Sequence, residues 1–83
     1  MNTYDMYKEV AIKFAKKYEV DNDHIIDIIT SLMMTRDGHW SGGSFVQAVL
    51  ENDLLKTINR ADATCLSNLR VIVAAKEFCH MDR

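Results

Sequence analysis

The chain has 83 residues, with ten basic and twelve acidic side chains, a formal net charge of −2, no proline and three glycines. Such a length fits one domain, here residues 1–83, and a hydrophobic content of 48% argues against an intrinsically disordered chain. The charge balance argues against direct nucleic-acid binding, which needs a basic surface. The lack of proline argues against a turn-rich β-sandwich or barrel. The composition therefore predicts a single all-α domain.

The cysteines and the apolar segments bear on where the protein works. Cys65 and Cys79 lie fourteen positions apart and form no C-x-x-C motif, whereas small secreted domains that depend on disulfides usually carry at least about four cysteines. Residues 1–10 lack the apolar core of a secretory signal. The longest apolar run, residues 71–75, is far shorter than a membrane span. We expect a cytoplasmic protein that has no membrane span and binds no cofactor.

Two helices are predicted in the first half of the chain, where apolar residues recur at helical spacing. The first begins near Asn2 or Thr3, either of which can supply an N-cap oxygen, and it ends at about Tyr18. The second follows the polar residues 21–23, which suit a helix start, and carries a wide apolar arc rich in isoleucine. It ends just before Gly38, which can adopt the left-handed conformation of a helix C-terminus.

A third helix is predicted over residues 44–61 and a fourth over residues 63–79, the latter with Asp62 or Thr64 as its N-cap. The third helix has apolar residues on two sides, with Val46, Leu50, Leu54, Ile58 and Ala61 on one and Phe45, Ala48, Val49 and Leu55 on the other. A helix buried on two sides belongs near the middle of a bundle. The predicted fold is a compact bundle of about four helices with a glycine-rich loop at residues 37–43.

The glycine-rich loop gathers residue types that anchor protein interfaces. Arg36, His39 and the only tryptophan, Trp40, lie in or beside it, and tryptophan and arginine are enriched among the residues that dominate binding energies. A second interpretation is that Trp40 covers the core while the glycines allow a close approach to the third helix. In a third, the backbone of residues 42–44 binds an anion at a helix N-terminus. Arg36, His39 and Trp40 are the candidate partner contacts.

The third predicted helix also carries a polar sector. Asp53, Lys56 and Arg60 stand at i, i+3 and i+7, with Asn52 alongside. This spacing suits salt bridges within the helix, worth a few tenths of a kcal/mol each. Because the rest of the helix is expected to be buried, the four residues are also candidate contacts for a partner.

The fourth predicted helix carries a second apolar stripe in addition to its main face. Val71, Ala74 and Phe78 form this stripe. Either the helix is enclosed on nearly all sides, or the stripe meets another chain. The second interpretation predicts an oligomer interface, for example in a homodimer.

Neither metal binding nor catalysis is predicted. His24, His39 and His80 have no i, i+4 spacing among themselves, and none stands at a usual ligand interval from a cysteine. Cys65 and Cys79 both fall on the main apolar face of the fourth predicted helix, which is typical of small core residues. No separately placed base is identifiable for a cysteine nucleophile. We therefore expect a protein that is not an enzyme and holds no metal.

The segment between Trp40 and Asp62 carries a recognisable block of residues. Its elements are Gly43-Ser44-Phe45, Ala48-Val49-Leu50, Asn52-Asp53-Leu54 and Arg60-Ala61-Asp62. The block resembles one found in small proteins of phages and other mobile elements, in which a proline often precedes the Gly-Ser-Phe where this chain has Gly42. The resemblance covers a little over a quarter of the chain. It implies a small helical fold of phage-like origin and supplies no catalytic residues.

A phage-like origin implies a function that differs from enzyme catalysis. Short charged proteins of this kind often bind host machinery stoichiometrically, and some inhibit defence complexes such as CRISPR effectors. The resemblance thus implies a host protein or protein complex as partner, in the cytoplasm of the host cell. The alternative is a small nucleic-acid-associated transcriptional regulator that reads DNA with its third or fourth helix. Binding of that kind weakens steeply with added salt.

Overall fold

The computed structural model describes residues 2–77, which form six α-helices and no strand. The helices are α1 (Thr3–Lys17), α2 (Asp23–Arg36), α3 (Ser44–Leu50), α4 (Leu54–Arg60), α5 (Ala63–Ser67) and α6 (Leu69–Glu77). The prediction of an all-α fold is confirmed for this part of the chain. None of these helices has the length and apolar character that crossing a membrane requires.

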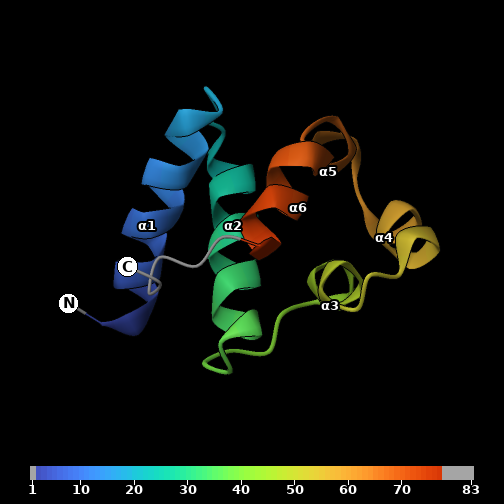
Figure 1. Cartoon of the computed structure of the whole chain (residues 1–83), viewed down its shortest axis with the longest axis horizontal. Helices are drawn as coiled ribbons and strands as arrows, with labels where there is room; N and C mark the ends of the chain where they lie inside the picture. Colours follow the sequence, from blue (N-terminus) through green and yellow to red (C-terminus); the bar gives the residue numbers. More distant parts are fainter. Residues whose placement is uncertain (1, 78–83) are drawn as a thin grey trace.

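The helices are arranged around α2, which lies at the centre of the molecule (Figure 1). α1 lies beside α2 and α6 packs against α2 from the other direction, while α3 is seen end-on near the lower half of α6. Ile25, Ile29, Leu32 and Met33 of α2 have no solvent exposure, and Ile72 of α6 joins them. The core is therefore built on α2, and α4 lies at the opposite end of the molecule from α1.

Four helix starts are fixed by side chains that replace missing backbone partners. Asn2, Asn22, Asp53 and Asp62 each accept a hydrogen bond from the backbone N–H three residues further along. This is the N-cap arrangement that satisfies an orphan donor of the first helical turn. The predicted caps at Asn2 and Asp62, and the predicted start within residues 21–23, are confirmed.

Three helix ends share one C-terminal geometry. Glu19, Gly38 and Asn52 each have a positive φ, of 61°, 84° and 61°. After each, the chain folds back so that two N–H groups bond to carbonyls of the last turn, as His39 and Gly38 do with Met34 and Thr35. This pair of bonds defines the Schellman motif. The left-handed Gly38 is as predicted.

The prediction of one continuous helix over residues 44–61 is wrong, because α3 ends at Leu50 and α4 begins at Leu54. Asn52 adopts a left-handed backbone, its N–H bonds to the Val49 carbonyl at 3.2 Å, and the Asp53 N–H bonds to the Ala48 carbonyl at 3.0 Å. The Asp53 side chain then accepts from the Lys56 N–H and begins α4. Two adjacent polar residues thus end one helix and start the next. The expected burial on two sides holds for α3, where Phe45, Val46, Ala48 and Val49 are buried. It is wrong for α4, where Leu54 and Leu55 are 68% and 70% exposed.

The fourth predicted helix, over residues 63–79, is interrupted at Asn68. The Asn68 side-chain amide donates to the Thr64 carbonyl at 3.0 Å, and the Asn68 N–H bonds to the Cys65 carbonyl. Such side-chain bonding to a carbonyl four residues back competes with a regular helix. α5 therefore ends at Ser67 and α6 begins at Leu69. The predicted end at Cys79 lies outside the described residues.

Candidate functional site

The helix α4 buries few of its side chains and exposes several apolar ones. Only Thr57 of this helix is buried, and α4 packs mainly against α3. Leu54, Leu55 and Ile58 are 68%, 70% and 44% exposed. We call these three residues the α4 apolar surface. Single exposed apolar residues are ordinary on protein surfaces, but three on one seven-residue helix are a candidate contact surface.

The helical spacing sorts the side chains of α4 into separate flanks. Ile58 stands at i+4 from Leu54 and at i+3 from Leu55, so that the three apolar side chains are neighbours. Lys56 and Arg60 also stand at i and i+4 and form a basic flank. No carboxylate lies within α4, and no ion pair involves Lys56 or Arg60 within residues 2–77. α4 therefore presents apolar groups beside two cations.

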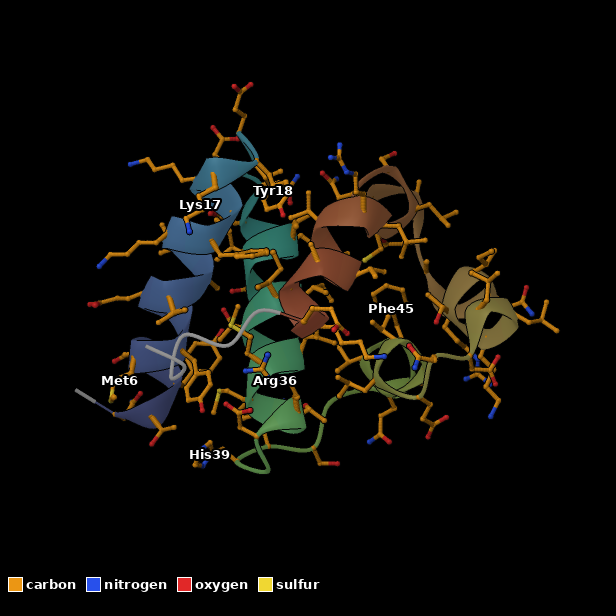
Figure 2. All side chains as sticks on the ribbon, viewed as in Figure 1. Met6, Lys17, Tyr18, Arg36, His39 and Phe45 are labelled. Atoms are coloured by element: carbon orange, nitrogen blue, oxygen red, sulfur yellow. The ribbon has the colours of Figure 1, made fainter. Side chains whose placement is uncertain are left out.

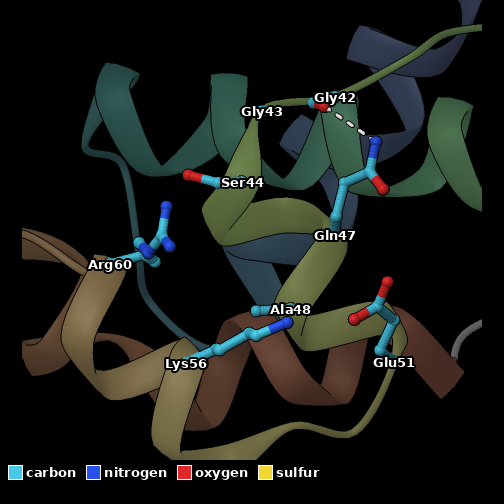
Figure 3. Close-up of a pocket in the computed structure, with 8 residues that line it drawn as sticks. All are labelled: Gly42, Gly43, Ser44, Gln47, Ala48, Glu51, Lys56 and Arg60. Atoms are coloured by element: carbon cyan, nitrogen blue, oxygen red, sulfur yellow. Dashed lines mark hydrogen bonds between the residues drawn. The ribbon is translucent and has the colours of Figure 1, made fainter.

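A cleft of about 270 Å³ lies between the basic flank of α4 and the start of α3. Figure 3 shows Arg60 extending toward Ser44 and Lys56 extending toward Ala48. Across the cleft, the Gln47 side-chain amide donates to the Gly42 carbonyl at 3.2 Å. The two cations of the predicted polar sector thus line one cleft open to solvent, together with Gly42, Gly43 and the acidic Glu51.

A second cavity, of about 220 Å³, borders the apolar side of α4. Leu54 contributes to its wall, together with Leu69 and Val73 of α6 and the Lys76 side chain. Val73 is itself 44% exposed. The α4 apolar surface therefore continues into a groove toward α6, and Lys76 adds a further cation at its edge.

Two of the four predicted contacts in the polar sector have structural roles. Asn52 supplies the left-handed turn, and its side-chain oxygen accepts a hydrogen bond from Lys76. Asp53 caps α4. The salt bridges expected between Asp53 and the two cations are absent within residues 2–77. Lys56 and Arg60 remain the members of this set that are available to a partner.

The predicted contacts of the loop lie away from α4. Figure 2 labels Arg36 on α2 and His39 in the loop that follows it. Arg36 donates to the carbonyls of Ala75 and Lys76 at 3.5 and 3.3 Å, and pairs with Asp37 at 2.9 Å. Arg36 is thus engaged with the last turn of α6 rather than displayed.

The two rings of the loop rest on tyrosines of α1. The His39 ring packs edge-on against Tyr7, with ring centroids 5.6 Å apart, and Trp40 packs against Tyr4 at 5.7 Å. Trp40 nevertheless remains 47% exposed. The structure does not bring His39 or Trp40 together with the basic flank of α4, and their role as partner contacts stays a prediction.

The two members of the predicted oligomer stripe within residues 2–77 do not form an exposed face. Val71 is only 8% exposed and belongs to the core, and Ala74 is half-buried against it. The third member, Phe78, lies outside the described residues. Within α6, Val71, Ile72 and Ala75 face the core and Val73 is exposed.

Sequence reasoning missed one cluster of chemically active side chains. The Nε2 atom of His24, at the start of α2, lies 2.9 Å from the Asp62 Oδ2 atom and 3.8 Å from the Cys65 Sγ atom. Cys65 is buried, as predicted, while His24 and Asp62 are exposed. His24 and Cys65 are 41 positions apart, so that no local spacing signals their contact.

Two pKa shifts accompany this cluster. Burial, followed by the nearby Asp62 carboxylate, raises the pKa of the Cys65 thiol from 9.0 to about 11. Hydrogen bonds from the Cys65 N–H and side chain lower the pKa of Asp62. The thiol is therefore protonated at neutral pH, which disfavours a nucleophilic role for Cys65.

Comparison with known proteins identifies no relative of this chain. No protein-family model matches the chain, and neither the curated proteins nor the solved structures contain a match.

Proposed function

We propose that this chain is a non-enzymatic interaction protein of phage type that binds a host protein complex through α4. The observation that carries the proposal is the exposure of Leu54, Leu55 and Ile58 on a helix that buries only Thr57. Burying such side chains against a partner is favourable by roughly 25 cal/mol per Å² of apolar surface.

The charges around α4 indicate the chemistry of the partner. Lys56 and Arg60 flank the apolar residues, and Lys76 borders the adjoining groove. A complementary protein surface presents apolar side chains next to carboxylates, because opposite charges steer association and exclude mismatched partners. Inhibition of a host defence complex, such as a CRISPR effector, is the activity that the resemblance to phage proteins implies for such binding.

The binding part of the proposal is tested by capture with matched variants. The tagged chain, Leu55→Glu and the control Ile12→Glu are each incubated with a bacterial lysate, and the captured proteins are quantified by mass spectrometry. Ile12 is 42% exposed on α1, so that both substitutions place a charge on an exposed helix position. We expect one host complex to be lost at least about tenfold with Leu55→Glu, a change of about 1.4 kcal/mol, and to be kept by Ile12→Glu.

Two further variants separate α4 from the loop. Combined Lys56→Glu and Arg60→Glu is expected to weaken the same capture, whereas Trp40→Ala is expected to leave it unchanged. Loss of capture with Trp40→Ala, while Leu55→Glu binds normally, would move the interface to the loop. Self-association through α4, seen as a dimer in sedimentation that Leu55→Glu turns into a monomer, would contradict a host partner.

The inhibitory part of the proposal has its own measurement. The chain is expressed in bacteria that carry an active CRISPR system directed against a test phage, and the plating efficiency of the phage is counted. Restoration of plaques by the chain but not by Leu55→Glu supports inhibition. Equal plating with and without the chain, across the defence systems tested, rejects inhibition while leaving the binding result intact.

A further inference from the structure

The His24, Asp62 and Cys65 cluster joins the start of α2 to the start of α5. One oxygen of Asp62, Oδ1, accepts the Cys65 N–H at 2.8 Å and caps α5. The other oxygen, Oδ2, points at His24 Nε2, 2.9 Å away. The cap therefore holds the Asp62 carboxylate in place with one oxygen aimed at the histidine and the sulfur close by.

The geometry argues against a proton relay between the three groups. In a nucleophile–histidine–carboxylate relay, the carboxylate bonds to one ring nitrogen and the nucleophile to the other. Here the carboxylate and the thiol both approach the same atom, Nε2. Three donor atoms that converge in this way can share a cation instead.

We propose that His24, Asp62 and Cys65 form a binding site for a zinc-type divalent cation, with water as the fourth ligand. The three ligand atoms lie within 4.8 Å of one another. Zinc takes imidazole nitrogen, carboxylate oxygen and thiolate sulfur at about 2.0–2.3 Å, which places tetrahedral ligands roughly 3.3–3.7 Å apart. The observed 2.9 and 3.8 Å separations need to change by only a few tenths of an ångström, and the separation between the Asp62 oxygen and the Cys65 sulfur, at most 4.8 Å, needs to shorten by up to about 1 Å.

The surroundings of the cluster fit an open coordination site. The side chains of His24 and Asp62 are 49% and 57% exposed, so that a cation and its water can enter from solvent. Cys65 is 3% exposed and supplies the sulfur from the protein side. On binding, the Sγ–H proton leaves for solvent as the sulfur–metal bond forms. The metal then links two helix starts that are far apart in the sequence, and it stabilises the folded chain.

Cobalt(II) reports on the site because its spectrum identifies both tetrahedral geometry and sulfur ligation. The full chain is titrated with Co²⁺, then with Zn²⁺, under reducing conditions. We expect one Co²⁺ per chain, a thiolate-to-cobalt charge-transfer band, visible bands of a tetrahedral centre, and loss of all three when Zn²⁺ displaces the probe. Zn²⁺ is also expected to raise the melting temperature.

Matched variants assign the ligands. Cys65→Ser should abolish the charge-transfer band, and His24→Ala, at an exposed position, should weaken Zn²⁺ binding at least about tenfold. Asp62→Asn keeps an oxygen for the cap, and it separates capping from ligation by losing affinity while the helix content is unchanged. Cys79→Ser and His39→Ala are controls that retain the full spectrum.

Two results reject the proposed metal site. One is a wild-type chain that binds no stoichiometric Co²⁺ or Zn²⁺, and the other is a thiolate-to-cobalt band that disappears with Cys79→Ser and persists with Cys65→Ser. Neither result bears on partner binding through α4, because the variants of the two sites share no residue.

Discussion

Asn52 and Asp53 stand next to each other and act on two different helices. Asn52, at φ 61°, closes the last turn of α3, while the Asp53 carboxylate accepts the Lys56 N–H and opens α4. With one residue ending a helix and the next starting another, α4 is directed away from the path of α3. This pair of residues is the reason that Leu54 and Leu55 reach solvent instead of continuing the buried faces of α3.

Substitution of Asn52 tests the left-handed conformation. Asn52→Gly should stabilise the fold by at most about 1 kcal/mol, because glycine adopts a positive φ without the clash of a Cβ atom. Loss of the exposed hydrogen bond from Lys76 and the greater freedom of glycine in the unfolded chain offset part of this gain. Asn52→Ala should destabilise it by about 1 kcal/mol. The free energy of unfolding in urea measures both. Asn59→Ala, at an exposed position in the last turn of α4, is the control for loss of an asparagine side chain and should not lower the stability, because alanine has the higher helix propensity.

Substitution of Asp53 tests the start of α4. Asp53→Ala should cost about 1 kcal/mol, because it leaves the Lys56 N–H without its cap, whereas Asp53→Asn should be nearly neutral. Urea unfolding gives the stability, and amide hydrogen exchange over residues 54–60 shows whether α4 alone opens. Equal exchange in Asp53→Ala and the wild type would show that the cap does not hold this helix.

How far the sequence predicts this fold depends on the range of the interactions involved. The caps at Asn2 and Asp62 and the turn at Gly38 are local, and their residue types identify them. The breaks at Asn52 and Asn68 are also local, but asparagine is an acceptable polar residue within a helical pattern. Asn52 is left-handed without being a glycine, and Asn68 breaks its helix through a side-chain hydrogen bond. Both features give a weak signal in the sequence, so that the pattern of apolar residues predicts continuous helices instead.

The candidate sites depend on longer-range information. The spacing of the apolar residues in α4 does not show whether they face the chain's own core or a partner. The left-handed turn at Asn52 directs α4 so that they face solvent. The contact between His24 and Cys65 joins positions 41 residues apart, which spacing within one helix cannot predict. Lys56 and Arg60 are predicted as contacts because they form a polar sector on a helix expected to be buried elsewhere, and the structure leaves both cations exposed.

Gly42 and Gly43 provide a matched test of the loop that leads into α3. A Cβ atom at Gly42 would lie 2.8 Å from Thr35 Oγ1 and 2.8 Å from Val46 Cγ1, whereas one at Gly43 would meet nothing within 4 Å. Thr35 and Val46 are β-branched and have little freedom to move aside. Gly42→Ala should therefore destabilise the fold by about 1–3 kcal/mol.

Gly43→Ala is the control for that substitution, and it should change stability by less than about 0.5 kcal/mol. Thermal and urea unfolding measure both variants. Similar stabilities of the two variants would show that the loop moves away from α2 without cost, contrary to the close packing at Gly42.

The buried thiol of Cys65 predicts a loss of stability at alkaline pH, measured with a chelator present. Its pKa rises from 9.0 to about 11 because burial disfavours the thiolate. Below pH 9.0 the thiol is protonated in both states, and its contribution to stability is complete. Between pH 9.0 and about 11 the unfolded chain releases the proton that the folded chain retains, so the free energy of unfolding falls, by up to about 3 kcal/mol.

Urea unfolding of the wild type and Cys65→Ala at pH 8 and pH 10.5 isolates this contribution from the other groups that titrate in the alkaline range. The difference in stability between the two proteins should shrink as the pH rises, because only the wild type carries the buried thiol. Cys79→Ala should follow the wild type.

The same burial lowers the thiolate fraction of Cys65 on the order of 100-fold at neutral pH, so alkylation of Cys65 in Cys79→Ala should be slow until the chain is unfolded. Rapid alkylation of the folded chain would show that α5 opens readily and exposes the sulfur.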